Sequence, residues 1–387
     1  MFDFIKNKTV FANKYHTHHE AIIVSCFFNP QQSSYRLKAF NQFYERIKHL
    51  NHLIIECVIG DSKAQLAEND NIKRVYTKSL LWHKETLINR AIFQLPPQFK
   101  YVFWVDADVI FTNLDWLVDG VESLRSHQII QPFEYCVHLN RDQLKPTFNL
   151  DDLRLNNLPN NINSKVWRSF CANFVNTSLW QDQNYNSHGH VGFAWGARRE
   201  VLEAVPLYDR ALIGGADHII AHAAAGQIPH PCIAKSFTDN LDEVIAWSNQ
   251  FYQVTQANIG YVKGDLYHLW HGDINKRQYL QRIKDFTRVS NQITRRDRNG
   301  LFEADGDDDS YISDYFDLRE VSDGQEEEEN NDDDNLLNSV IVGEVTDSTI
   351  LGAAISGNMV GAILGENLNN TDDYNESNDS NDSDTFS

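Results

Sequence analysis

Apolar runs alternate with amphipathic segments along the first 140 residues of the chain. Short runs with little polar interruption predict buried β-strands at residues 21–28, 52–61, 72–78 and 101–111. Segments with apolar side chains at helical spacing predict helices between these strands, at residues 34–50 and 82–95. This alternation of strand and helix predicts an α/β layer with a mainly parallel central sheet flanked by helices.

Beyond residue 140 the pattern is less regular, and turn-rich pieces predict an irregular insertion. Regular patterns return in four later segments. Residues 188–205 predict a strand leading into a helix, and residues 207–226 predict a Gly-Gly turn that opens a helix. Residues 241–256 predict a helix, and residues 260–273 predict strands with a turn. Asp217 follows the Gly-Gly turn, and we expect it at a mobile and partly exposed helix start.

The formal charge of −20 is unevenly distributed over the 387 residues. From Glu303 to Ser387 there are 25 acidic residues and one basic residue, Arg319, so this tail carries −24 and the preceding body +4. Such an acidic, low-complexity segment cannot bury enough apolar area to order itself, so residues 301–387 are expected to be disordered. An uncharged apolar island at 348–365 interrupts the tail, with small residues at every fourth position, as in helix packing.

The cysteines and the N-terminus point to a reducing, cytoplasmic setting. The five cysteines are scattered without a C-x-x-C pair, so neither a disulfide framework nor a thiolate zinc site is expected. Residues 1–20 form a charged extension that lacks the apolar core of a secretory signal. No apolar stretch of the body is long enough to span a bilayer.

Two carboxylates interrupt the apolar run at 101–111. The pair Asp106 and Asp108 can be interpreted in three ways: as a capped strand end, as a divalent cation site, or as a phospho-aspartate nucleophile of the haloacid dehalogenase type. In haloacid dehalogenases the motif normally lies near the start of the domain, and Thr or Val stands where this chain has Ile110. Mg²⁺ and Mn²⁺ prefer oxygen ligands and share them with substrate phosphates, so the pair is a candidate metal site.

Several motifs follow one another in an order that resembles GT-A fold glycosyltransferases of the family 2 kind. They are "AIIVSCFFN" (21–29), "HKETLINRAI" (83–92), "FWVDADVIF" (103–111), "VGFAWGARREVLEAV" (191–205), "LIGGADHII" (212–220) and "HLWHGD" (268–273). The resemblance covers most of residues 20–275. Alanine stands where the family's "GGED" pattern has its first acid, so only Asp217 matches that pair.

The resemblance implies a GT-A (Rossmann-like) domain over residues 21–300. This domain would comprise a nucleotide-binding half (21–140), an acceptor half (141–275) and a basic terminal helix (276–300), followed by the tail. The implied donor is a UDP- or GDP-sugar bound with Mn²⁺ or Mg²⁺. The implied acceptor is a glycan or lipid-linked hydroxyl, in surface polysaccharide or glycoconjugate synthesis.

The resemblance also implies roles for individual residues. Asp106, Asp108 and a late histidine would hold the metal, with Asp106 also contacting the donor. Only one of His268 and His271 can face the site if the segment is extended, and we favour His271 because Gly272 follows it. Asp217 would be the general base, and the donor-binding candidates are Lys84, Asn89 and Asp61.

The leading hypothesis is a metal-dependent hexosyltransferase, with inversion favoured over retention. The alternatives are a phosphohydrolase that uses the same D-x-D and a catalytically inactive binding module. The basic stretch 276–298 holds eight basic residues and could attract an anionic membrane surface. No nucleic-acid partner is expected.

Overall fold

The computed structural model of the chain describes residues 14–147, 166–182, 188–212, 214–236, 241–272, 293, 295–304 and 312. The apolar island at 348–365 and residues 276–292 of the basic stretch lie outside the described residues. Within the described residues, no helix combines the length and the apolar character needed to cross a membrane.

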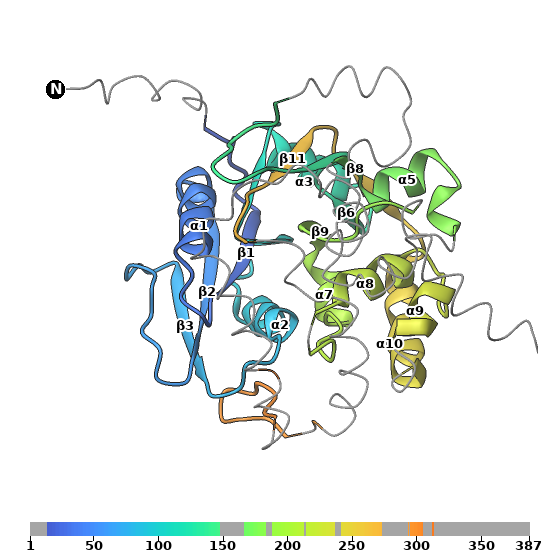
Figure 1. The fold of residues 1–387 in the computed structure, drawn as a ribbon. Coiled ribbons are helices and arrows are strands. Elements are labelled where there is room, and N and C mark those ends of the chain that lie inside the picture. The colour runs from blue at the N-terminus through green and yellow to red at the C-terminus, as the bar shows by residue number, and fades with distance from the viewer. Residues whose placement is uncertain are drawn as a thin grey trace, which may run out of the picture.

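A seven-stranded sheet forms the centre of the fold (Figure 1). In spatial order its strands are β10 (Ile259–Tyr261), β6 (Ile129–Gln131), β9 (Ala194–Arg198), β4 (Tyr101–Val105), β1 (Ala21–Phe28), β2 (His52–Ile59) and β3 (Ile72–Thr77). Only β9 pairs antiparallel with its two neighbours, β4 and β6. The mainly parallel sheet expected from the sequence is therefore confirmed.

Both faces of this sheet are buried at β1, β2 and β4, which explains the nearly unbroken apolar runs of these strands. In β1, Ile22 and Val24 point into one hydrophobic cluster, and Ala21 and Ile23 point into the other. β4 alternates in the same way, with Trp104 on the first face and Phe103 on the second.

Helices cover the two faces of the sheet. On one side lie α1 (Ser34–Ile47) and α3 (Trp116–Leu124), whose apolar residues share a cluster with Phe103. The other side is covered by α2 (Lys84–Gln94), α5 (Phe170–Asn176), α7 (Arg199–Ala204), α8 (Ala216–Ala224), α9 (Pro231–Ser236) and α10 (Leu241–Thr255). A short 3₁₀ turn, η1 (Leu179–Gln181), follows α5.

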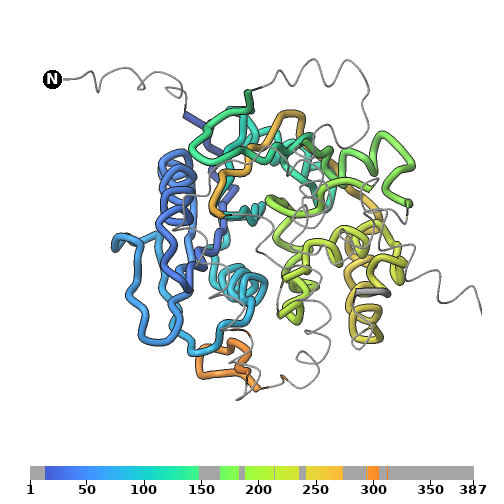
Figure 2. Tube along the Cα trace, in the orientation of Figure 1, coloured from blue at the N-terminus to red at the C-terminus, as the bar shows by residue number. Residues whose placement is uncertain are grey.

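A smaller sheet of four strands stands beside the central one. Its order is β5 (Val109–Phe111), β11 (Asp265–His268), β7 (Tyr135–His138) and β8 (Val166–Arg168). β11 pairs antiparallel with β5 and parallel with β7. Figure 2 shows the gold trace of β11 running along the teal segments that it joins, although they are far apart in sequence.

The run at 101–111 is not one strand, as the sequence predicted, but two. β4 ends at Val105 in the large sheet, and β5 begins at Val109 in the small sheet. Residues 106–108 form the turn between them. Val105 of β4 and Val109 and Phe111 of β5 are buried in the same hydrophobic cluster, so the two carboxylates mark a change of sheet within one continuous core.

A third cluster extends the folded body past residue 300, where the sequence placed its boundary. Leu301 and Phe302 are buried, and Phe302 packs with Leu81 and Leu212. Ile312 belongs to the same cluster. The start of the acidic segment thus contributes apolar side chains to the fold.

We expect Phe302→Ala to lower the free energy of unfolding by about 3–5 kcal/mol, because it empties a buried aromatic site. The substitution also removes the ring that lies 3.6 Å from the Arg296 guanidinium carbon. Urea unfolding measures the loss. The matched control is Phe93→Ala, since Phe93 is 57% exposed, and it should change stability by about 0.5 kcal/mol or less. Equal effects of the two changes would place Phe302 outside the cooperative fold.

Candidate active site

The turn between β4 and β5 places Asp106 and Asp108 at the carboxyl end of β4. The backbone N–H of Asp106 donates to the carbonyl of Phe193 at 2.7 Å, and the N–H of Leu269 donates to the carbonyl of Asp108 at 2.9 Å. β4 runs parallel to β1, so the turn lies at the edge of the sheet where α/β proteins bind ligands.

Lys84 links two carboxylates that are far apart in sequence. It is the first residue of α2, and its Nζ lies 2.8 Å from Asp106 Oδ1 and 3.2 Å from Asp217 Oδ2. The Lys84 and Asp217 side chains are 9% and 3% exposed. One ammonium thus pairs with two carboxylates in a mostly buried site, where a charge without a counter-charge would be costly.

Asp217 lies in the first turn of α8, after Gly215 at φ 106°, a backbone conformation that favours glycine. The sequence predicted a mobile and partly exposed position, and the predicted exposure is wrong. Every residue of α8 is buried, because the helix packs against α10 and within the main hydrophobic cluster. The Asp217 carboxylate is held in place by the Lys84 ammonium.

Asp108 meets two histidines from the segment that leaves β11. Its Oδ2 lies 3.0 Å from His271 Nε2 and 3.9 Å from His268 Nε2. The sequence left only one histidine facing the site if the segment was extended, but the segment is not extended throughout, because the strand ends at His268. His268 pairs with Val109 in the sheet, and the chain then turns, so His271 comes back to the same carboxylate.

The three side chains fit a divalent cation. The two Nε2 atoms are 3.2 Å apart. Two nitrogens bound at about 2.1 Å at right angles around one metal are separated by about 3 Å. Asp108 Oδ1 is buried and has no hydrogen-bond partner among the described residues, which a bound cation would supply. Asp108, His268 and His271 together form a possible ligand set for one ion.

Aromatic rings that the sequence analysis did not single out pack against the histidine pair. The Phe193 ring stacks on His190 at 4.1 Å between centroids and on His268 at 4.8 Å. Phe193 has φ 77°, an uncommon conformation for an aromatic residue. Burial, with His138 nearby, lowers the pKa of His190 well below its usual value, so this imidazole is neutral. In the sequence, only the three closely spaced rings of "HGHVGF" (188–193) could have indicated this packing.

Two other residues predicted from the sequence, Asn89 and Asp61, lie outside the groups formed around Lys84 and Asp108. Both amide atoms of Asn89 bond to the Leu207 backbone, with Nδ2 donating to its carbonyl at 2.8 Å and Oδ1 accepting from its N–H at 2.9 Å. This amide fixes α2 to the segment after α7 and leaves little capacity for a nucleotide. Asp61 is exposed just beyond β2, and none of the ion pairs described above includes it.

Comparison with protein-family models gives no match, and neither does comparison with curated proteins. Several solved structures resemble the chain weakly. The catalytic domain of Drosophila β1,4-galactosyltransferase 7, in complex with xylobiose, is 12% identical, with 76% of this chain and 99% of that chain covered, at a TM-score of 0.31. Mannosyl-3-phosphoglycerate synthase from Rubrobacter xylanophilus is 11% identical, with 73% and 78% covered, at 0.31. The 4-diphosphocytidyl-2C-methyl-D-erythritol synthase from Anaerococcus prevotii is 10% identical, with 79% and 96% covered, at 0.28. At such TM-scores the likeness carries no argument about this chain, and its chemistry is inferred from the site.

We expect Lys84→Met to lower the free energy of unfolding by about 3–5 kcal/mol in metal-free buffer, because it removes the ammonium that pairs with the buried carboxylate of Asp217. Chemical denaturation measures the change. Lys100→Met is the matched control, since Lys100 pairs with Glu20 at the surface and should contribute about 1 kcal/mol or less. If both variants lose equally little stability, the ion pairs of Lys84 do not hold the site together.

Proposed function

We propose that the chain is a metal-dependent glycosyltransferase that uses a nucleotide-diphospho-sugar donor. One observation carries the proposal. The turn after β4 presents Asp108 to a pair of imidazoles and, two residues earlier, presents Asp106 to Lys84, whose ammonium also pairs with Asp217. A cation site and a lysine–carboxylate pair therefore lie next to each other at the carboxyl edge of the sheet, where a diphosphate and a hydroxyl could meet.

In this proposal Asp108, His268 and His271 hold the cation. A bound divalent ion would stabilise the negative charge that builds on the leaving diphosphate. Two of the three ligands are imidazoles, which suit a transition metal better than Mg²⁺, so we favour Mn²⁺. The nucleotide can be UDP or GDP.

Asp217 and Lys84 would act on the side of the acceptor. Asp217 accepts the proton of the attacking sugar hydroxyl, and we favour inversion of the anomeric centre with this residue as the single base. Lys84 keeps the Asp217 carboxylate in position and places an ammonium beside the donor site. The acceptor would be a glycan or a lipid-linked hydroxyl, reached in the cytoplasm or at an anionic membrane surface.

A binding test separates this function from a phosphohydrolase. The melting temperature is measured with Mn²⁺ and UDP or GDP, and separately with Mn²⁺ and a simple phosphomonoester. A transferase is expected to be stabilised by a nucleoside diphosphate only when Mn²⁺ is present. A screen of nucleotide sugars for slow hydrolysis then identifies the donor. Stabilisation by the phosphomonoester alone would favour the phosphohydrolase.

We expect Asp108→Asn to abolish Mn²⁺-dependent binding of the nucleoside diphosphate and to reduce donor turnover to background, since it removes the charged ligand of the cation site. Calorimetric titration and donor hydrolysis measure the two effects. Asp70→Asn makes the same chemical change at an exposed position and should leave both unchanged. Unchanged Mn²⁺ dependence in Asp108→Asn would exclude the cation site assigned here.

We expect Asp217→Asn to slow transfer to an acceptor by about 10²–10⁴-fold while sparing donor binding, because the base acts on the acceptor hydroxyl. The asparagine carbonyl can still accept a hydrogen bond from Lys84, which preserves the local geometry. Initial rates with acceptor and the donor dissociation constant are compared. Parallel losses in rate and donor affinity would point to a structural role for Asp217.

A further inference from the structure

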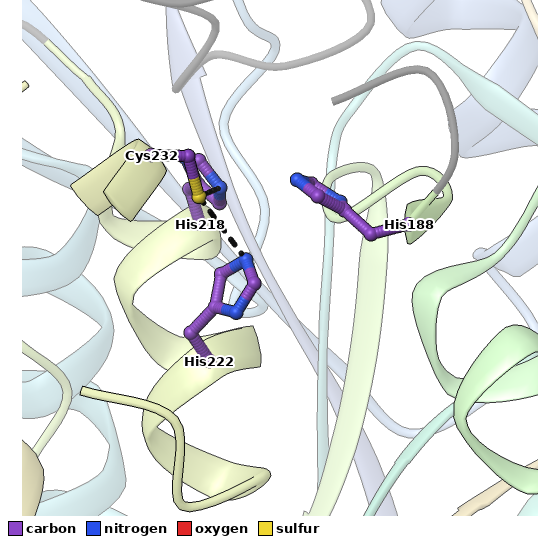
Figure 3. Close-up of side chains that lie close together, drawn as sticks. All are labelled: His188, His218, His222 and Cys232. Carbon is purple, nitrogen blue, oxygen red and sulfur yellow. Dashed lines mark hydrogen bonds between the residues drawn. The ribbon is translucent and has the colours of Figure 1, made fainter. Parts of the chain in front are cut away.

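A second group of metal-ligating side chains lies apart from the proposed active site. His218 and His222 project from one face of α8, four residues apart, and Cys232 belongs to α9. His188 lies before β9 and approaches from the opposite side, as Figure 3 shows. All four side chains are buried, at 1% exposure or less.

The four potential ligand atoms, one from each side chain, lie within 4.8 Å of one another. Cys232 Sγ is 3.1 Å from His218 Nε2 and 3.4 Å from His222 Nε2. Around a tetrahedral zinc ion, with bonds of about 2.3 Å to sulfur and 2.0–2.1 Å to nitrogen, such atoms would be about 3.5 Å apart. The distances from the sulfur to the two imidazole nitrogens are thus close to those between zinc ligands. His188 faces these three atoms from the side of the fourth tetrahedral position.

The surroundings suit ligands rather than ordinary core residues. His230 Nδ1 lies 2.7 Å from Cys232 Sγ and can donate to a thiolate, as outer hydrogen-bond partners of metal ligands do.

The chemistry of this group differs from that of the site at Asp108. It holds three imidazoles and a sulfur and no carboxylate, a donor set that suits zinc and not Mn²⁺ or Mg²⁺. Four protein ligands would fill a tetrahedral ion completely, as in structural sites, whereas catalytic sites keep a position open. The ligands come from three separate segments, so the sequence, with no C-x-x-C pair, shows only the four-residue spacing of His218 and His222.

We propose that His188, His218, His222 and Cys232 form a structural zinc site that fixes α8 to α9 and to the segment entering β9. The Cys232 thiol loses its proton when the ion binds. His218 follows Asp217 directly in α8, so the ion would anchor the helix that carries this carboxylate. The site would serve to hold α8 in place, and it does not depend on the chain being a glycosyltransferase.

Metal analysis of the full chain, purified without a histidine tag and dialysed against a weak chelator, tests this proposal. We expect one zinc ion per chain, lost in Cys232→Ser and retained in Asp108→Asn, which alters only the other site. Cys57→Ser removes a different buried thiol, on β2, and should also retain the zinc. A chain that retains no zinc, or a Cys232→Ser variant that retains it fully, overturns the proposal.

Cobalt substitution gives an answer even if Cys232→Ser fails to fold. The unaltered chain loaded with Co²⁺ should show the intense visible bands of a tetrahedral ion and a thiolate-to-cobalt charge-transfer band in the near ultraviolet. The site at Asp108 contains no sulfur and cannot produce that charge-transfer band. Its absence from cobalt-loaded chain would overturn the proposal, and would leave the proposed glycosyltransferase function untouched.

Discussion

Three carboxylates meet at the carboxyl edge of the central sheet, and their need for positive charge organises the region around them. Asp106 and Asp217 share the ammonium of Lys84, and Asp108 faces two imidazoles. A buried carboxylate without a partner would cost several kcal/mol. This requirement ties together the start of α2, the turn after β4, the first turn of α8 and the end of β11.

The change of sheet at residues 106–108 makes this convergence possible. β4 delivers Asp106 beside parallel β1, and β5 pairs with β11, whose last residue is His268. A single continuous strand would have sent the two carboxylates to positions along one sheet, away from the end of β11. The backbone bond from Leu269 to the carbonyl of Asp108 holds the two segments together at the point where the ligands meet.

The helix α8 connects the proposed zinc site to the proposed base. It carries Asp217 at its start and presents His218 and His222 to Cys232, and all of its residues are buried. A helix that is enclosed on every side is held rigidly, which suits a carboxylate that must keep its place beside a lysine. An ion bound to His218 would restrain the helix one residue away from that carboxylate.

The sequence by itself determined the alternation of strands and helices, because buried strands and helix spacings leave a local pattern. It also contains the D-x-D motif, and the resemblance to GT-A glycosyltransferases pointed to Lys84, Asp217 and His271 as candidates. Only the tertiary structure decided that residues 101–111 are divided between two sheets. An apolar run has the same sequence pattern whichever sheet buries it. The tertiary structure also brought His268 to Asp108 and assigned Asn89 to the Leu207 backbone. Lastly, it gathered His188, His218, His222 and Cys232. The four-residue spacing of His218 and His222 is local, but their contacts with His188 and Cys232 depend on packing between distant segments.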